Sequence, residues 1–457
     1  MDKSTDIKTY IKNNQTRILE ELFGLIRIPS VSPKPEHKKD MQLAAEYVAD
    51  ALLKAGAEKS EIILTSGNPV VYGEKIIGSE KPTVLVYGHY DVMPPEPLEL
   101  WKSNPFEPEV RDNRIYARGA NDDKGQLFMH IIAFEYLVKT NSLNCNVKFM
   151  IEGEEEVGSD GLKEFCRNNT ERLKSDIIIV SDTTMSTDEI PSITVGLRGI
   201  CGFELEVTGP DRDLHSGHYG GAVLNPVNAL SKIIAGLTDE QYRITIPGFY
   251  DDIAEISQQE RSELKNAPFS TEKFKKSINI KDTTGEPEYS ILERIGMRPS
   301  LDANGIWGGY MGEGSKTIIP SKAFAKITMR LVPNQDPDKI KIQFDDYIQK
   351  ITPIGVKSNV KYMHGGAAYV SPINSKGFLA ASKAYEKTFG MKPIPIRSGG
   401  SIPIIADFEK ILGVKSILMG FGLESDAIHS PNENFRLDYF FKGIETITYF
   451  YQNYSAE

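Results

Sequence analysis

The chain opens with two stretches in which apolar residues recur at helical spacing. The first stretch carries one apolar stripe, made by Ile7, Ile11, Ile18, Leu22 and Ile26. The second stretch covers residues 39–55, with Leu43, Tyr47 and Leu52 on its apolar side and Gly56 as its stop signal. Both patterns predict helices that pack one face on a core.

Beyond residue 60 the pattern changes to short apolar runs rich in β-branched residues, which predict buried strands. Residues 124–139 interrupt them with the apolar spacing of a helix. Strands that alternate with helices predict an α/β domain with a mainly parallel central sheet, whose ligands gather at the carboxyl ends of the strands. The runs are EIILT (61–65), PVVYG (69–73), PTVLVYG (82–88), NVKFMIEG (146–153) and SDIIIVSD (175–182).

The character of the chain changes near residue 198. An alternating strand, a loop rich in Gly and His, further strands and two helices then follow, and residues 237–300 are polar and poor in strand formers. We therefore expect a smaller α+β domain over residues 198–370, a lid and dimerisation domain inserted into the larger one. The larger catalytic domain would comprise residues 1–197 and 371–457.

Length, composition and net charge indicate which kinds of protein and of binding partner fit this sequence. With 457 residues the chain is long enough for two cores, and 40% hydrophobic and 25% charged residues are ordinary for a globular protein. A net charge of -10 argues against nucleic acid or an anionic membrane surface as a partner. The N-terminal residues lack the apolar core of a signal peptide, and no run approaches the ~20 apolar residues of a membrane span, so we expect a cytoplasmic protein. Cys145, Cys166 and Cys201 are too few and too scattered for a disulfide framework.

Residues of metal-ligand type follow several of the predicted strands. Taken alone, a histidine such as His89 at the end of an apolar strand is more often a buried, hydrogen-bonded structural residue. An acidic triplet is usually a solvated turn, and an aspartate can cap a helix. Carboxylates gathered at one edge of a sheet repel each other and need raised pKa values or cations. Two divalent metals would supply the cations, with imidazole nitrogen and carboxylate oxygen as ligands suited to zinc or manganese. The residues concerned are His89, Asp122, Glu154, Glu155, Glu156, Asp182 and His429.

Eight motifs, in order along the chain, resemble one family of enzymes. These are the co-catalytic metallopeptidases that include carnosinase, cytosolic non-specific dipeptidase, aminoacylase and bacterial acyl-amino-acid deacylases. The resemblance runs from about residue 15 to the C-terminus, except for the polar insert 237–300, and is greatest to the dipeptidase branch. The motifs are GHYDVMP, GANDDKG, EGEEEVGS, VSD, DLHSGHYGG, KTIIPSKAFAKITMRLVP, RSGGSIP and AIHSPNE.

The resemblance implies a set of metal ligands. Asp122 would bridge two divalent ions. His89 and Asp182 would complete the ligands of one ion, and Glu156 and His429 those of the other. Zinc is the first expectation, with manganese and cobalt as alternatives, because nitrogen and oxygen ligands accept all three.

The resemblance also implies the catalytic carboxylates. Asp91 would fix the imidazole of His89. Alignment on the Gly-Ser after the triplet makes Glu155 the general base for a water shared by the two ions, and leaves Glu154 without a role. The peptide bond between Asp122 and Asp123 is expected to be cis, as in the family.

Recognition of the substrate would fall to the inserted domain. In the family the histidine of the DLHSG motif, here His215, reaches the substrate of the neighbouring subunit, which implies a homodimer. Arg330 resembles the arginine that binds the substrate carboxylate, although an arginine in a surface salt bridge fits the same strand. Ser401 and Gly400 resemble the turn that holds the same end of the substrate, and Thr317 is a weaker candidate.

The implied activity is hydrolysis of an amide bond in dipeptides or short peptides with a free carboxylate. Two alternatives stay open: a deacylase of N-acetyl or N-succinyl amino acids, and a non-catalytic relative that binds peptides. His364 has no assigned role.

Overall fold

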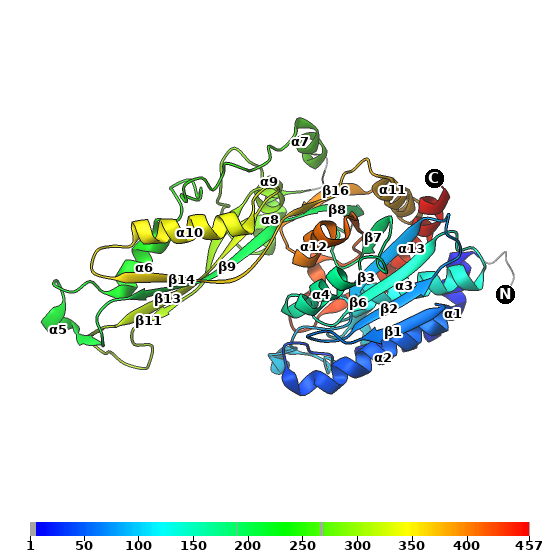
Figure 1. Ribbon diagram of the computed structural model, residues 1–457, viewed down its shortest axis with the longest axis horizontal. Coiled ribbons are helices and arrows are strands. Elements are labelled where there is room, and N and C mark those ends of the chain that lie inside the picture. Colours follow the sequence, from blue (N-terminus) through cyan, green and yellow to red (C-terminus); the bar gives the residue numbers. More distant parts are fainter. Residues whose placement is uncertain (1–5, 189, 266, 268, 457) are drawn as a thin grey trace. The chain divides into compact units, whose positions relative to one another are not determined.

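The structure is a computed structural model, and it describes residues 6–188, 190–265, 267 and 269–456 (Figure 1). Packing of the backbone divides the chain into two compact units, which are called the first and the second unit below. The first unit comprises residues 1–195, 371–396 and 407–457, and the second comprises 196–370 and 397–406.

A mixed sheet runs through the first unit. At its centre, β3 (Thr83–His89) pairs in parallel with β6 (Asn146–Glu152) and with β7 (Ile177–Val180), and β7 pairs in parallel with β17 (Ser416–Leu418). The predicted α/β class is confirmed, although the parallel part is confined to these central strands. The flanking strands of the first unit are β1 (Lys59–Ile63) and β2 (Val70–Lys75), together with the first residues of β8 (Ser192–Leu197) and of β16 (Ile394–Ser398). Strand β15 (Tyr369–Val370) belongs to the second unit, where it pairs with the last two residues of β8.

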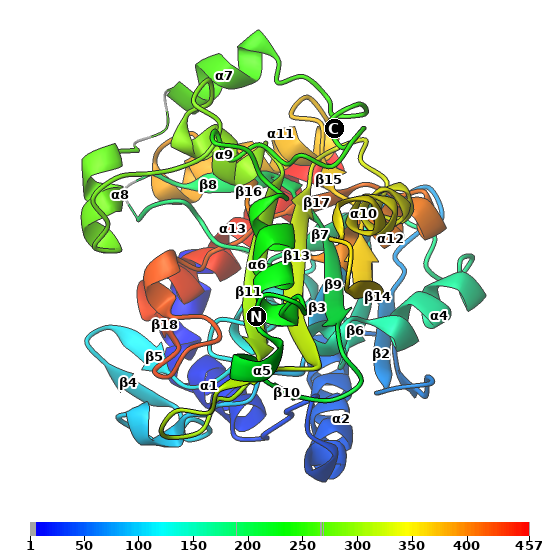
Figure 2. The same ribbon diagram turned by 90° about the vertical axis from the view of Figure 1, so that its left-hand side faces the viewer.

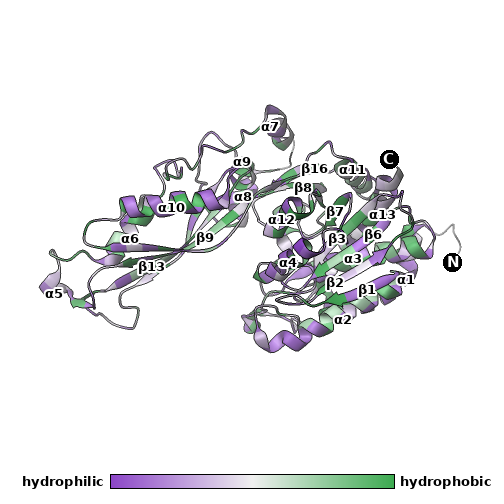
Figure 3. Ribbon diagram, in the orientation of Figure 1, coloured by the Kyte–Doolittle hydropathy of each residue, from purple (hydrophilic) through white to green (hydrophobic). Residues whose placement is uncertain are grey.

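Helices cover both faces of the central strands (Figure 2). Val84 and Val86 of β3 belong to the same apolar cluster as the residues of α3. On the opposite face, Tyr87 meets Phe408 of α12 with ring centroids 5.0 Å apart. Figure 3 colours β3 and β7 as hydrophobic, as expected of strands covered on both sides. The helices are α1 (Ile7–Ile26), α2 (Lys38–Ala55), α3 (Lys124–Lys139), α4 (Asp160–Asn168), α11 (Lys376–Phe389), α12 (Pro403–Leu412) and α13 (Leu437–Ala456).

The two N-terminal helices form where the apolar spacing predicts them. All five residues of the predicted stripe in α1 are buried. In α2 the prediction was wrong for Leu43, which is 51% exposed. The buried side of α2 uses Met41, Ala44, Ala45 and Val48 instead, because small alanines let this helix pack closely.

The second unit is built on an antiparallel sheet in the order β11-β13-β9-β14. Helices α6 and α10 share an apolar cluster with its buried residues. Strand β11 was not predicted, because its sequence SLDANGIWG is polar and it joins the sheet through backbone pairing with β13. The elements are β9 (Gly199–Thr208), α6 (Pro226–Ala235), β11 (Ser300–Gly308), β13 (Lys322–Leu331), α10 (Pro337–Ile351) and β14 (Lys357–Gly366).

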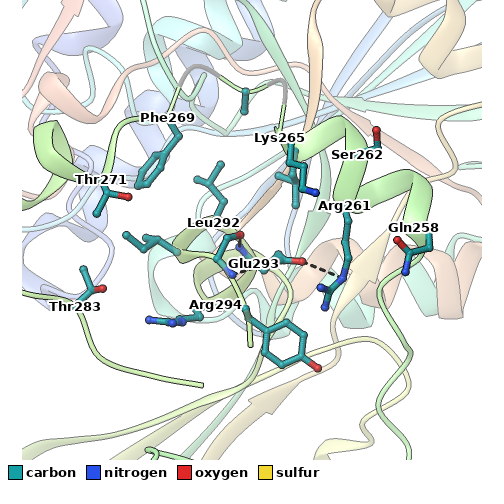
Figure 4. Close-up of a pocket in the computed structure, with 15 residues that line it drawn as sticks. Gln258, Arg261, Ser262, Lys265, Phe269, Thr271, Thr283, Leu292, Glu293 and Arg294 are labelled. Atoms are coloured by element: carbon teal, nitrogen blue, oxygen red, sulfur yellow. Dashed lines mark hydrogen bonds and ion pairs between the residues drawn. The ribbon is translucent and has the colours of Figure 1, made fainter. Parts of the chain in front are cut away.

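The polar insert contributes three short helices to the second unit, α7 (Gln258–Lys265), α8 (Thr271–Ser277) and α9 (Ile291–Gly296). They line a pocket of about 580 Å³, in which Arg261 of α7 lies 3.2 Å from a carboxylate oxygen of Glu293 (Figure 4). This ion pair links α7 to α9 although both helices are too short to be stable alone.

Small elements complete both units. The first unit has a three-stranded sheet in the order β18-β5-β4, with β4 at Glu109–Arg111, β5 at Arg114–Tyr116 and β18 at Asn434–Arg436. The second has α5 (Ser216–Tyr219) beside the paired strands β10 (Leu214–His215) and β12 (Ile318–Ile319).

The three cysteines lie in the interior of the protein. Cys145, Cys166 and Cys201 are buried and unpaired. Burial raises the pKa of the Cys145 and Cys201 thiols to about 12, so these side chains stay neutral and pack as small apolar groups. Among the described residues, no helix combines the length and the apolar character needed to cross a bilayer.

Candidate functional site

Three of the predicted ligands follow strands of the first unit, and the other two lie in its loops. His89 is the last residue of β3, and Asp182 lies two residues beyond β7. Asp122 lies in the loop before α3, and Glu156 lies in a short 3-10 turn after β6. His429 comes from the loop before β18. Parallel strands bring their carboxyl ends to one edge, which is why residues so far apart in sequence can meet.

These five side chains form two groups that share one aspartate. In each group the ligand atoms lie within 4.8 Å of one another. The first group is His89, Asp122 and Asp182, in which Nε2 of His89 lies 3.1 Å from Oδ1 of Asp122 and 3.8 Å from Oδ2 of Asp182.

The second group is Asp122, Glu156 and His429. Nε2 of His429 lies 2.9 Å from Oδ2 of Asp122 and 3.3 Å from Oε2 of Glu156. Asp122 therefore turns one oxygen to each group, which is the arrangement expected of a bridging carboxylate. The peptide bond between Asp122 and Asp123 is cis, as predicted.

The electrostatics of the cluster favour cations. Burial raises the pKa of Asp182 well above its usual range, and the charge of Asp122 adds to the effect. Burial raises the pKa of Glu155 to about 8, with Glu156 and Asp122 acting in the same direction. Hydrogen bonds to Asp122 and Glu156 raise the pKa of His429 to about 10. The crowded carboxylates therefore favour either bound protons or bound cations, which would offset their charge.

The donor set fits two divalent ions. Each group offers one imidazole nitrogen and two carboxylates, the ligand types that zinc and manganese accept. Oε1 of Glu156 is buried and has no hydrogen-bond partner among the described residues, so a ligand-type oxygen remains free. Cations would balance the negative charge that burial makes costly.

Asp91 holds two parts of the site together. Nδ1 of His89 lies 3.0 Å from the carbonyl oxygen of Asp91 and 3.3 Å from its Oδ1. The carboxylate also accepts hydrogen bonds from the backbone N–H groups of Glu155 and Glu156, each at 3.2 Å, and from Ser32 at 2.6 Å. Asp91 thus orients the imidazole and also anchors the glutamate turn, a second contact that the sequence did not reveal.

Glu154, which had no assigned role, is separate from the ligand groups. Its Oε2 accepts a hydrogen bond of 3.0 Å from the backbone N–H of Gly161, in the first turn of α4. A carboxylate at this position satisfies a free N–H and interacts favourably with the helix dipole. Glu154 therefore supports α4.

Other polar contacts near the ligands were missed. Nε2 of His130, on α3, lies 2.8 Å from Oγ of Ser181, the neighbour of Asp182. Burial lowers the pKa of His130 to about 3, so the ring is neutral. Glu433 and Asp426 are also buried beside the loop of Asp122. The signals that the sequence offers for them are a lone His within an apolar helix and two acids beside His429: Asp426 directly precedes the AIHSPNE motif, and Glu433 is its last residue.

The candidate carboxylate-binding residues come together in the second unit. NH1 of Arg330 donates a 2.7 Å hydrogen bond to Oγ of Ser401, which in turn donates to the carbonyl oxygen of Gly199 at 3.2 Å. Gly400 precedes Ser401 in the same turn. Among the described residues no carboxylate lies within 4.0 Å of the Arg330 guanidinium, so the alternative of a surface salt bridge is not seen.

His215 and Thr317 are neighbours elsewhere in the second unit. His215 pairs with Ile318 across β10 and β12, and the carbonyl oxygen of Thr317 accepts from the N–H of Ser216 at 3.0 Å. The exposed ring of His215 stacks on that of His218, with centroids 4.4 Å apart. His364 lies on β14, where burial and then the charge of Arg330 lower its pKa.

Comparisons with known proteins identify the family of the chain. The profile of peptidase family M20/M25/M40 matches residues 85–453. Cys-Gly metallodipeptidase dug1 of Schizosaccharomyces pombe is 32% identical over 451 residues, with 95% of each chain covered.

Two solved structures are similar along nearly the whole chain. An M20 family metallo-carboxypeptidase, Sso-CP2 from Sulfolobus solfataricus, has a TM-score of 0.88 and 34% identity, with 96% of this chain and 99% of that chain covered. Human carnosine dipeptidase 1 has a TM-score of 0.86 and 28% identity, with 99% and 98% covered. Because the family profile spans far more than half of the sequence, this chain belongs to peptidase family M20/M25/M40.

Proposed function

We propose that the protein is a metal-dependent dipeptidase, which hydrolyses the amide bond of dipeptides or short peptides with a free carboxylate. The observation that carries this proposal is Asp122, which belongs to both ligand groups and has one oxygen beside each histidine. Dipeptidases among the relatives support the choice of substrate.

In this proposal one ion is held by His89, Asp122 and Asp182, and the other by Asp122, Glu156 and His429. When bound, two such ions would lower the pKa of a water molecule that they share to about 7, and they would polarise the amide carbonyl. Zinc is proposed first, and manganese or cobalt would fit the same donors.

Glu155 is the proposed general base. Burial beside other carboxylates raises its pKa, which makes the carboxylate a better proton acceptor. It would take a proton from the attacking water and return it to the leaving nitrogen, so one carboxylate serves as base and then as acid. Asp91 would keep the Glu155 turn in place through its hydrogen bond to the Glu155 backbone N–H.

Arg330 is proposed to bind the substrate carboxylate, with Ser401 and the backbone of Gly400 beside it. Its guanidinium has free N–H groups and no carboxylate partner within 4.0 Å among the described residues, and a planar guanidinium can bind a carboxylate through two parallel hydrogen bonds. His215, with Thr317 as a weaker candidate, is proposed to contact the substrate carbonyl of the neighbouring subunit in a homodimer. A cytoplasmic location, with no nucleic acid or membrane partner, completes the proposal.

A substrate panel tests the proposed function against the deacylase alternative. The metal-free protein is loaded with zinc or, separately, with manganese, and is assayed on dipeptides and on N-acetyl and N-succinyl amino acids. We expect the highest kcat/KM on a dipeptide. Faster turnover of an acylated amino acid than of every dipeptide would refute the proposed substrate, and turnover of neither class would favour a peptide-binding relative.

A further inference from the structure

A fully buried carboxylate holds the backbone of the loop that carries Asp122. Glu433 is 0% exposed. Its Oε1 accepts hydrogen bonds from the backbone N–H groups of Asn121 and Asp122, at 3.0 and 3.1 Å. Its Oε2 accepts from the N–H of Gly119 at 3.0 Å and from NH1 of Arg118 at 2.8 Å. All four donors therefore belong to one short segment that ends at the shared ligand.

The same carboxylate belongs to the loop of the other ligand, His429. Three residues of that loop that are not glycine have left-handed backbone angles, with φ of 56° at Ala427, 62° at His429 and 64° at Asn432. Such angles are unfavourable for residues with a Cβ and persist where the surroundings fix them. The loop of His429 consequently needs anchors at its ends.

Asp426 and Glu433 are those anchors. At the start of the loop, Oδ2 of Asp426 accepts a 2.7 Å hydrogen bond from the side-chain amide of Asn121. At its end, Glu433 binds the backbone of Asn121 and Asp122. Both ends of the His429 loop are thus fastened to the dipeptide that contains the shared ligand.

We propose that Glu433 is a positioning residue of the candidate metal centre. It fixes Asp122 and His429 relative to each other before a cation arrives, so that less ordering accompanies binding. The inference rests on the proposed function, in that it takes Asp122 and His429 to be ligands. Groups that support metal ligands from outside typically contribute 10- to 100-fold to metal affinity.

Glutamine at position 433 is the informative change because it keeps the size of the side chain. Each carboxylate oxygen of Glu433 accepts two N–H groups. An amide NH₂ in place of either oxygen would point its hydrogens at two other donors. The Glu433→Gln variant should therefore lose the hold on the Asp122 loop without leaving a cavity.

Glu135→Gln is the matched control. Glu135 is also a buried glutamate of the first unit, 4% exposed, and it accepts hydrogen bonds from Tyr10, Arg17 and Lys139. Its loss removes a comparable network from helices α1 and α3, away from either ligand loop.

The test titrates the metal-free full chain with Zn²⁺ by calorimetry, in wild type and in both variants. We expect the affinity of at least one ion to fall about 10- to 100-fold in Glu433→Gln and to stay within about twofold of wild type in Glu135→Gln. Unchanged affinity in a folded Glu433→Gln protein would overturn the inference alone, whereas a wild type that binds no Zn²⁺ would overturn the proposed function as well.

Hydrogen exchange on the metal-free wild type gives an answer even if the variant does not fold. The inference predicts that the backbone N–H groups of Asn121 and Asp122 are protected from exchange before any metal is added, because Glu433 already binds them. Exchange at the rate of exposed amides would contradict it.

Discussion

Substitution of Arg330 by methionine offers a direct test of carboxylate recognition. Arg330 donates to Ser401 at 2.7 Å, and no carboxylate among the described residues lies within 4.0 Å of it. Methionine keeps most of the apolar length of the side chain and leaves no buried carboxylate without its partner, so the fold should tolerate the change.

The expected loss follows from the interaction that disappears. A hydrogen bond to a charged group contributes about 1.5 to 3 kcal/mol, which corresponds to a fall of about 10- to 150-fold in kcat/KM. The loss should apply to a substrate with a free carboxylate, such as Ala-Ala, and not to its C-terminal amide. In wild type the free acid should therefore be the better substrate, and in Arg330→Met the two should become nearly equal.

The assay compares kcat/KM for the two substrates in wild type, Arg330→Met and Lys326→Met. Lys326 is an exposed cation on the same strand, four residues earlier, and controls for the general loss of positive charge. An equal loss for both substrates in Arg330→Met would refute carboxylate recognition by this residue, as would full activity on the free acid.

Three further outcomes are expected. Glu154→Gln should lower the free energy of unfolding, measured in urea, by about 1 kcal/mol, because the hydrogen bond from the Gly161 N–H weakens. Its kcat should stay within about twofold of that of wild type, and a large fall in kcat would place Glu154 in the reaction. Burial lowers the pKa of His130 to about 3 from 6.5, so on acidification the histidine takes up a proton in the unfolded chain before it does so in the folded protein, and the free energy of unfolding falls as the pH drops below 6.5. Between pH 7 and 5 the free energy of unfolding of wild type should therefore fall by about 2 kcal/mol more than that of His130→Asn. Parallel plots of this free energy against pH for the two proteins would contradict the argument. Each zinc ion, at 100 times the Kd of its site, should stabilise the folded protein by about 2.7 kcal/mol, seen as a higher Tm that EDTA reverses. Asp122→Asn should abolish this shift because it changes the ligand shared by both groups.

The pattern of the sequence predicted those elements whose apolar residues alternate or recur regularly. Strand β3 and helix α1 are examples, because burial of one face or of both leaves a clear period. The buried side of α2 was not predicted correctly because it is built largely from alanines, which give a weak hydrophobic pattern beside the larger but exposed Leu43. Strand β11 was not predicted because backbone hydrogen bonds to β13, and not apolar side chains, place it in the sheet.

The candidate site divides in the same way. Residues at strand ends, such as His89 and Asp182, could be found because strand direction brings them to one edge. The contacts that hold these residues in place could not be predicted from the sequence, because each joins a side chain to the backbone of a residue far away in the sequence. Asp91 binds the N–H groups of Glu155 and Glu156, and Glu433 binds the loop of Asp122 from more than 300 residues away. Only the folded chain shows such pairs.

The Glu155→Gln variant provides the most direct test of the proposed mechanism, when metal content and turnover are measured on the same preparation. Glutamine keeps the shape of the side chain but cannot take the proton from water. The proposed mechanism predicts that the variant binds two metal ions per chain, as wild type does, and that kcat for a dipeptide falls by about 10²- to 10⁴-fold. Hydrolysis at the wild-type rate with both ions bound would contradict the assignment of Glu155 as the base.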